Sequence, residues 1–431
     1  MESTPQGNPP VAAPDRSRRL ELLSVLALSI GAVILVRTLH QNRLRYKEEA
    51  FCDYYVWSLE LRLGGDPWLP ASDVSFRARP GIPHRGVCNY PPVFLLAFEP
   101  FTKLSRPAAF WILQAILVAS MLGATILITH ETGPPGSATP YLAAIAAVLL
   151  FPETYGALYE SEPTFLLLAV LMGALALDRR GHSTAAGFAL ALATLLKFYP
   201  GLIGCYFLLR RRWATVAWSF GFAFAGLIVG GLRHHYEMMR FGVPITNQWW
   251  IQDRAIGILQ SMRSMVAAVA GNQFSARMML AWLSSSALLY ALVGAAAVDA
   301  TIRSAERDDL DLISFGLWIA AALLYSPLAW AHELPLMIPL WIGAAACIAR
   351  GAARRNVGTI LLMLGLAGTI APYFTGPLRR THMFFAAAIL AYAGAWWLVR
   401  TWNAETIPSA ESRGRDQTQA GLAPMAAMKR S

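Results

Sequence analysis

The stretch Phe51–Leu63 carries the first side chain that could take part in acid–base chemistry. Its apolar residues recur with the period of a helix, which places Asp53, Trp57 and Glu60 on one face. A carboxylate there can accept the proton of an attacking hydroxyl. An ordinary Asp, with a pKa of about 3.9, is a weak base, and partial desolvation would strengthen it. The alternative is that Asp53 is a solvated charge or a helix N-cap.

Cationic side chains could stabilise the growing charge of a departing phosphate. Lys197 interrupts an apolar run, and a Lys within a membrane span is costly unless it faces a cavity or a partner. His332 follows Trp330 at the expected outer start of a span, and Arg379 and Arg380 form an outward basic pair. The alternatives are snorkelling for Lys197 and the two arginines, and a structural hydrogen-bonded role for His332.

Two acidic residues flank expected spans on the same side as these cations. Glu162 and Glu333 could bind sugar hydroxyls, or they could pair with Lys197 or His332. A structural salt bridge is the favoured interpretation for each. Arg254 and Arg263, in a later outer loop, are weaker candidates for phosphate binding, and the run at 210–212 is interpreted as a topology signal.

The composition predicts the setting in which these residues act. The chain has 431 residues, of which 56% are hydrophobic and 14% charged, whereas a soluble domain carries about a quarter charged residues. The charges gather between apolar runs of about twenty residues, the length of a membrane-spanning helix. The net charge of +10 is explained by basic residues at cytoplasmic span ends, and no basic stripe indicates a nucleic-acid partner. We therefore expect an all-α polytopic membrane protein.

Hydropathy and the basic clusters together predict about twelve spans with both termini cytoplasmic. Four basic clusters, at 179–180, 210–212, 303–307 and 350–355, fall inside, and only the pair at 379–380 falls outside. The expected spans are 20–39, 107–129, 139–152, 162–178, 184–199, 200–209, 213–232, 277–299, 311–326, 333–349, 357–374 and 382–400.

Several departures from a simple bundle are expected. Lys197-Phe198-Tyr199-Pro200 interrupts one long apolar run, which predicts a broken or re-entrant pair. Outer loops at about 40–106 and 233–276 carry Trp and Tyr, which suit helices at the membrane interface. The tails, 1–19 and 401–431, are expected to be disordered and cytoplasmic around a membrane domain at 20–400, and the run 20–39 to be a retained signal-anchor.

Two cysteines fall in the first outer loop, on the side of an oxidising compartment. Cys52 and Cys88 could form a disulfide there, and two free thiols are an equally good interpretation.

Metal and nucleotide chemistry find little support. Asp53, Asp66 and Asp73 are not at chelating spacing, and the adjacent His234 and His235 diverge on a helix. Gly-rich phosphate loops are absent. The sequence therefore predicts a metal-independent site with no nucleotide-sugar donor and no cofactor.

Four motifs follow one another along the chain. After Asp53 come Gly-Gly-Asp-Pro-Trp at 64–68, Asn-Tyr-Pro-Pro at 89–92, Lys-Phe-Tyr-Pro at 197–200 ahead of the Arg-rich turn, and Tyr-Ser-Pro-Leu-Ala-Trp-Ala-His at 325–332. In this order they resemble glycosyltransferase family 87, the polyprenyl-phosphate-sugar-dependent, mannosyltransferase-like membrane enzymes of the GT-C superfamily. The likeness covers about residues 20–400.

The resemblance implies a GT-C-type, inverting hexosyltransferase of the plasma membrane. It would move a hexose, such as mannose, from a polyprenyl-phosphate sugar to a hydroxyl of a glycolipid or envelope glycan on the outer face. Asp53 would be the general base. The substrate-binding residues would be Lys197, His332, Arg379, Arg380, Tyr90, Glu162 and Glu333. Such enzymes often carry a second His where this chain has Glu333, and Gly-Gln near 160–163, so the sugar or acceptor can differ.

Two other classes compete with a transferase. A transporter or lipid flippase would also have many spans and membrane-buried charges, but internal repeats are absent and the candidate residues cluster toward one face. A non-catalytic envelope scaffold is opposed only by the motifs.

Overall fold

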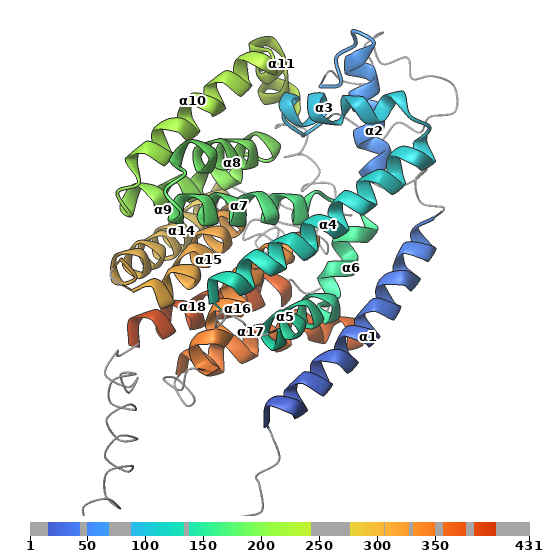
Figure 1. Cartoon of the computed structure of the whole chain (residues 1–431). Helices are drawn as coiled ribbons and strands as arrows, with labels where there is room; N and C mark the ends of the chain where they lie inside the picture. Colours follow the sequence, from blue (N-terminus) through green and yellow to red (C-terminus); the bar gives the residue numbers. More distant parts are fainter. Residues whose placement is uncertain are drawn as a thin grey trace, which may run out of the picture. The chain divides into compact units, whose positions relative to one another are not determined.

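The structure is a computed structural model, which describes residues 16–43, 50–68, 88–132, 138–242, 276–305, 307–326, 331–349, 357–375 and 383–401. Within these ranges every regular element is a helix (Figure 1). The chain divides into two compact units. Unit 1 comprises residues 1–196 and 222–246, and unit 2 comprises 197–221 and 247–431.

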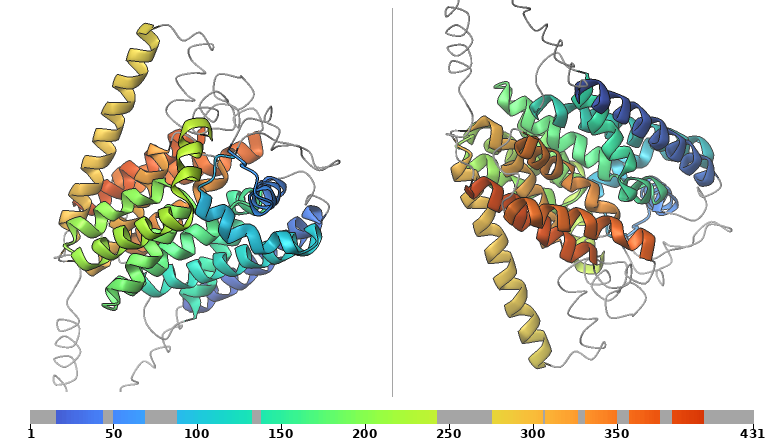
Figure 2. Two further views of the ribbon diagram at one scale, coloured as in Figure 1. Left: turned by 90° about the horizontal axis from the view of Figure 1, so that it is seen from above. Right: turned by 90° about the horizontal axis from the view of Figure 1, so that it is seen from below.

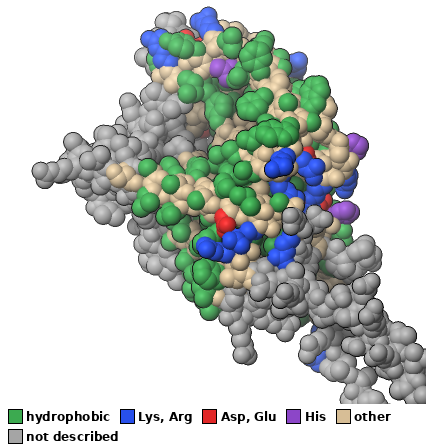
Figure 3. All heavy atoms as spheres, turned by 90° about the vertical axis from the view of Figure 1, so that its left-hand side faces the viewer, with side chains coloured by type: hydrophobic (Ala, Val, Ile, Leu, Met, Phe, Trp, Pro, Cys, Tyr) green, Lys and Arg blue, Asp and Glu red, His purple; other side chains and the backbone are tan. Residues whose placement is uncertain are grey.

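Membrane-spanning helices are present, as the composition predicts. Three helices, at 18–42, 106–132 and 332–349, are long and apolar enough to cross a bilayer. Two bent pairs raise the number to five if each is one span: 139–150 with 152–159, bent by 63°, and 213–229 with 232–241, bent by 93°. Hydrophobic side chains spread over the face shown in Figure 3, with Lys and Arg in small groups. The prediction of a helical membrane protein is confirmed, and the count of twelve spans stays a prediction.

Unit 1 is built around α4, which packs on α7, which in turn packs on α8. Its elements are α1 (Arg16–Asn42), α2 (Ala50–Arg62), α3 (Pro92–Phe98), η3 (Glu99–Lys103), α4 (Arg106–Thr132), α5 (Thr139–Leu150), α6 (Pro152–Tyr159), α7 (Thr164–Arg179), α8 (Ser183–Leu196), the second half of α10 (Trp213–Val229), α11 (Leu232–Glu237) and η5 (Met238–Gly242).

The first helix lies along α5. A Cβ on Gly31 would come within 2.6 Å of Leu149 Cβ, so glycine lets the two backbones approach. The Tyr155 hydroxyl donates a hydrogen bond to the Gly31 carbonyl at 3.2 Å. Elsewhere α1 exposes large apolar side chains, such as Leu22 and Val33. That exposure suits a helix surrounded by lipid.

Unit 2 is centred on α15, which packs against α14, α16, α18 and η4. Its elements are η4 (Tyr199–Ile203), α9 (Gly204–Leu209), the first half of α10, α14 (Ala276–Arg303), α15 (Asp308–Tyr325), η6 (Ala331–Met337), α16 (Ile338–Ala349), α17 (Val357–Thr375) and α18 (Met383–Thr401). Helices α17 and α18 lie side by side (Figure 2). A Cβ on Gly394 would come within 2.7 Å of the Gly358 carbonyl oxygen, so this close contact requires glycine.

The expected break near Lys197 is present. Helix α8 ends at Leu196, a 3₁₀ turn begins at Tyr199, and α9 begins at Gly204. Pro200 has no N–H to donate to an α-helical ladder, which explains why the helix cannot run through. One element was missed: helix α6 follows α5 after a single residue, where the sequence indicated the end of a span.

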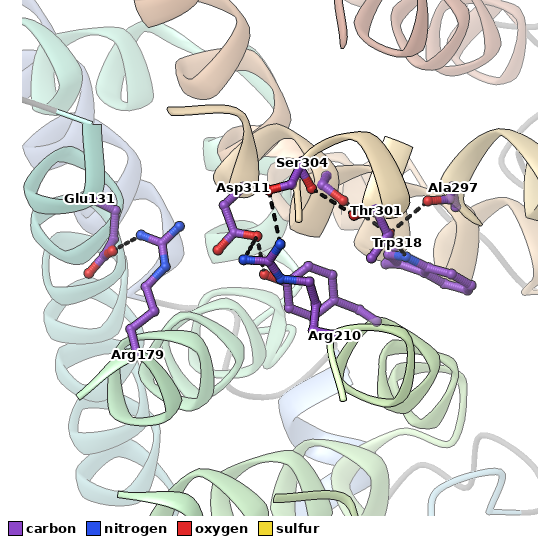
Figure 4. Close-up of polar contacts among 10 residues, drawn as sticks. Glu131, Arg179, Arg210, Ala297, Thr301, Ser304, Asp311 and Trp318 are labelled. Atoms are coloured by element: carbon purple, nitrogen blue, oxygen red, sulfur yellow. Dashed lines mark hydrogen bonds and ion pairs between the residues drawn. The ribbon is translucent and has the colours of Figure 1, made fainter. Parts of the chain in front are cut away.

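Two of the basic turns hold internal ion pairs (Figure 4). Arg179, at the end of α7, pairs with Glu131 at the end of α4. Arg210 donates to the Ser304 carbonyl at 2.9 Å and lies 3.4 Å from Asp311 Oδ1. Arg210 thus has a structural role beside the predicted topology signal, because it pairs with the buried Asp311 carboxylate.

A second polar cluster joins α14 to α15 within unit 2. The Trp318 indole donates to Thr301 Oγ1 at 2.8 Å, and the Thr301 hydroxyl bonds the Ala297 carbonyl (Figure 4). Ser314 Oγ lies 3.0 Å from Thr301 Oγ1. These bonds satisfy polar groups that would otherwise be costly at membrane depth.

Candidate active site

Helix α2 carries Asp53 and ends in a glycine cap. Gly64 has φ +80°, the Gly65 N–H donates to the Glu60 carbonyl at 3.0 Å, and the Gly64 N–H donates to Leu61. This is a Schellman ending, which needs a left-handed residue and here uses Gly64. A Cβ on Gly65 would collide with the Glu60 side chain. The Gly-Gly pair therefore fixes where α2 stops and where the following turn begins.

The apolar face of α2 packs on protein. The Phe51 ring meets Phe110 of α4 edge-on, with centroids 5.3 Å apart. The Tyr55 hydroxyl donates to the Leu104 carbonyl at 2.9 Å, and the Arg106 guanidinium lies over the Tyr55 ring. This face therefore rests on other parts of the protein. Asp53 itself lies half-buried in the first turn of α2.

A chain of buried hydroxyls runs from α2 to the start of α7. Tyr54 Oη and Tyr90 Oη are 2.8 Å apart, and the Tyr90 hydroxyl lies 2.9 and 3.1 Å from the two oxygens of Glu162. An ionised carboxylate only accepts, so Tyr90 donates to Glu162 and Tyr54 donates to Tyr90. Burial, together with the charge of Glu162, raises the pKa of Tyr54 well above its ordinary value. The phenol next to Asp53 is therefore neutral.

The turn that presents Glu162 has a left-handed backbone at Ser161, with φ +57°. Glu162 N–H donates to the Ala157 carbonyl and Ser161 N–H to Leu158, again a Schellman ending. Gln114 of α4 donates to Ser161 Oγ at 2.9 Å and to the Leu158 carbonyl at 2.9 Å. This position usually favours glycine, and in this chain the Gln114 amide holds the serine in place.

The turn after α2 is held against the segment before α3. Cys88 N–H donates to the Pro67 carbonyl at 3.0 Å, and the Trp68 indole donates to the Tyr90 carbonyl at 3.0 Å. Trp68 N–H donates to Asp66 Oδ1 at 3.1 Å, which closes an Asx turn. The Gly-Gly-Asp-Pro-Trp and Asn-Tyr-Pro-Pro motifs thus form one local structure.

Cys52 and Cys88 are not bonded to each other in the structure, and a disulfide between them stays a prediction. Cys52 and Cys88 are both buried free thiols. Cys88 Sγ instead accepts from the Tyr90 N–H at 3.4 Å. Burial raises the pKa of Cys88 well above its ordinary value, and the charges of Asp53 and Asp66 raise it further. Both carboxylates therefore lie close enough to the thiol to act on it.

In unit 2, Lys197 and Glu333 form a buried ion pair. Lys197 Nζ lies 2.6 Å from Glu333 Oε1, and the two side chains are 13% and 2% exposed. The Tyr199 hydroxyl donates to the same oxygen at 3.3 Å. Of the alternatives for Glu333, pairing with Lys197 is therefore realised. His332 lies next to Glu333 in the 3₁₀ turn and is half-buried.

Some of the expected site residues cannot be placed. Arg379, Arg380, Arg254 and Arg263 lie outside the described residues, as does most of the second outer loop. Tyr90 and Glu162 are brought together, and for each, contact with substrate stays a prediction. Among the described residues, no group of three or more His, Cys, Asp or Glu side chains is arranged to hold a metal ion.

Sequence comparison decides the family. The model of glycosyltransferase family 87 matches residues 89–327, more than half of the chain. The chain belongs to glycosyltransferase family 87. This family 87 protein is therefore a membrane glycosyltransferase, and the expectation of a hexosyltransferase is confirmed.

Two relatives are similar along most of their length. One is the polyprenol-phosphate-mannose-dependent alpha-(1-2)-phosphatidylinositol mannoside mannosyltransferase of Mycolicibacterium smegmatis, 27% identical over 332 residues, which are 72% of this chain and 73% of the relative. The other has the same name in Mycobacterium tuberculosis, with 27% identity over 333 residues, 72% of this chain and 74% of the relative.

Proposed function

We propose that this family 87 enzyme transfers mannose from a polyprenyl-phosphate donor to a hydroxyl of a membrane glycolipid or envelope glycan. Family membership carries the proposal, and the names of the two relatives support the mannose donor and a glycolipid acceptor. The reaction takes place on the outer face of the plasma membrane, in a GT-C-type protein of about twelve spans with cytoplasmic termini, and it needs no metal or other cofactor.

Asp53 is the general base in this proposal. The acceptor oxygen attacks the anomeric carbon and gives its proton to the Asp53 carboxylate, while the bond from that carbon to the phosphate oxygen breaks. The phosphate leaves with the bonding electrons, and attack from the opposite side inverts the anomeric centre. The half-burial of Asp53 in the first turn of α2 supports this role, since partial desolvation makes a carboxylate a stronger base.

The cationic residues stabilise the departing phosphate. Lys197 and His332 supply charge and hydrogen bonds, and Arg379 and Arg380 add to them. Lys197 is held by Glu333, so the lysine is ordered before the donor binds. An ordered cation needs less reorganisation when the phosphate charge develops, which is how such groups accelerate a reaction. In this proposal Glu333 also binds hydroxyl groups of the sugar.

The experiment compares Asp53→Asn with Glu60→Gln, a matched acid-to-amide change two turns further along α2. Membranes with each variant receive radiolabelled polyprenyl-phosphate mannose and a lipid extract. We expect Asp53→Asn to reduce transfer by about 10²- to 10⁴-fold, the usual contribution of a general base. Glu60→Gln should retain it. Undiminished transfer by a well-expressed Asp53→Asn variant would remove Asp53 as the base.

A further inference from the structure

Four buried polar atoms without hydrogen-bond partners among the described residues lie in the turn after α2 and in α11. They are Asp66 Oδ2, His234 Nδ1, His235 Nε2 and Glu237 Oε2. Native proteins bond nearly all such atoms, so each needs an explanation by a water, an ion or a ligand. Asp66 and His235 are only 7% and 9% exposed.

The turn and α11 are in direct contact. The rings of Trp68 and His234 lie with centroids 5.3 Å apart at an angle of 38°. Trp68 is fully buried and held by two hydrogen bonds, through its N–H to Asp66 and through its indole to Tyr90. His234 therefore packs on a tryptophan that is held in place, and the Asp66 carboxylate that helps to hold it uses only Oδ1 among the described residues.

His235 is oriented by a hydrogen bond of Nδ1, and its Nε2 has no partner among the described residues. His235 Nδ1 lies 3.0 Å from the Gly231 carbonyl oxygen, so Nδ1 carries the proton and Nε2 is an acceptor. Gly230 makes room for this ring, because a Cβ there would come within 2.5 Å of His235 Cε1 and 3.1 Å of Val93 Cγ2. Gly230 thus leaves room for the His235 ring, whose Nε2 has no hydrogen-bond partner among the described residues.

This corner adjoins the proposed base. Pro67 accepts the hydrogen bond of Cys88 N–H, and the Cys88 thiol experiences the charges of both Asp53 and Asp66. A molecule bound at Asp66 would therefore lie within electrostatic reach of the carboxylate that takes the acceptor's proton.

We infer that Asp66 and His234 form a subsite for a polyhydroxylated ring, the sugar or cyclitol part of the acceptor. Carboxylate and imidazole nitrogen pair well with hydroxyl groups, which both donate and accept. The Asp66 carboxylate disfavours a phosphate here by like-charge repulsion. The inference rests on the proposed function, since it assigns the acceptor's other hydroxyls while Asp53 takes the reactive one.

The test uses two variants that keep the local structure. Asp66→Asn retains an Oδ1 for the Trp68 N–H and replaces only the oxygen without a partner. His234→Phe keeps a ring on Trp68 and removes the nitrogen. His130→Phe, whose imidazole is 61% exposed at the end of α4, is the matched control. Transfer is measured against acceptor concentration at saturating polyprenyl-phosphate mannose.

We expect each subsite variant to raise the KM for the acceptor about tenfold or more, the effect of one lost hydrogen bond to a polar or charged group. The kcat and the KM for the donor should not change, and the control should match wild type. Unchanged acceptor KM in both variants, with Asp53→Asn inactive, would overturn this inference and leave the proposed function standing.

A direct binding measurement tests the subsite independently of mannose transfer. Saturation-transfer NMR with methyl α-D-mannoside and with myo-inositol is run on the detergent-solubilised wild type, Asp53→Asn and both subsite variants. We expect a ring signal in wild type and Asp53→Asn that is lost in Asp66→Asn and His234→Phe. If wild type shows this signal but transfers no mannose, the proposed function fails and the subsite stands. A signal equal in all four proteins, or absent from all, refutes the subsite.

Discussion

Replacing Lys197 tests both the ion pair and its role in the reaction. Lys197→Met keeps the length of the side chain and removes its charge, leaving the Glu333 carboxylate 2% exposed. The Tyr199 hydroxyl, at 3.3 Å, still donates to the same oxygen. Breaking a buried pair from one side typically costs about 3–5 kcal/mol, because the other charge stays desolvated. Lys197 is itself slightly exposed, so we expect about 3 kcal/mol, the low end of that range.

The double variant Lys197→Met with Glu333→Gln removes both charges. Buried pairs replaced by neutral groups often lose little stability. The Gln amide can still accept from Tyr199. We therefore expect the double variant to be more stable than Lys197→Met alone, with a coupling energy of about 1 kcal/mol or more between the two positions.

The assay measures stability and transfer on the same purified proteins. Equilibrium unfolding in mixed micelles gives the free energy of unfolding, and radiolabelled mannose transfer gives the activity. If Lys197 also stabilises the leaving phosphate, the double variant regains stability without regaining transfer. Wild-type stability of Lys197→Met would refute the pair, and full transfer by the double variant would refute the catalytic role of the lysine.

Three further predictions follow from single contacts. Tyr90→Phe removes the hydroxyl that donates to Glu162, and we expect a loss of about 1–3 kcal/mol in the free energy of unfolding, measured in the same micelles. Arg210→Met should destabilise the protein by several kcal/mol because it removes the positive charge paired with the buried Asp311 carboxylate. Arg211→Met, a neighbour with no such ion pair in the structure, should change stability little; equal effects of the two would refute this assignment. Burial keeps Cys88 protonated, so maleimide at pH 8 should label this thiol slowly in folded protein and rapidly after denaturation.

The sequence predicts helix ends well where a local residue type enforces them. Gly64 ends α2 because it can adopt a positive φ, and Pro200 interrupts the ladder after α8. Hydropathy places α4 and α17 to within a few residues for a related reason, since polar residues close each apolar run. Helix α6 was missed because its one-residue break from α5 leaves no gap in hydropathy.

The hydrogen-bond and ion-pair partners of a side chain are much harder to predict from sequence than helix ends. Tyr90 and Glu162 are 72 residues apart, and the sequence around either residue does not predict their hydrogen bond. Arg210 looked like a topology signal because the run of three arginines has that simpler explanation, while its carboxylate partner, Asp311, is 101 residues away. Pairing across such distances depends on how helices pack, which periodicity does not determine. Of the paired candidates, only Lys197 with Glu333 was among the alternatives raised from sequence.

Ser161 adopts a strained, left-handed backbone conformation in the turn that presents Glu162. A left-handed serine is strained by about 1–3 kcal/mol relative to an ordinary conformation. Glycine would relieve that strain, but it would leave Gln114 without its contact to the serine hydroxyl. The Schellman ending that requires φ +57° also sets the direction of the next residue, Glu162. Because Glu162 receives the Tyr90 hydroxyl, and Tyr90 receives that of Tyr54, the strained turn is coupled to the first turn of α2. The strain is thus retained where it fixes the helix that carries Asp53.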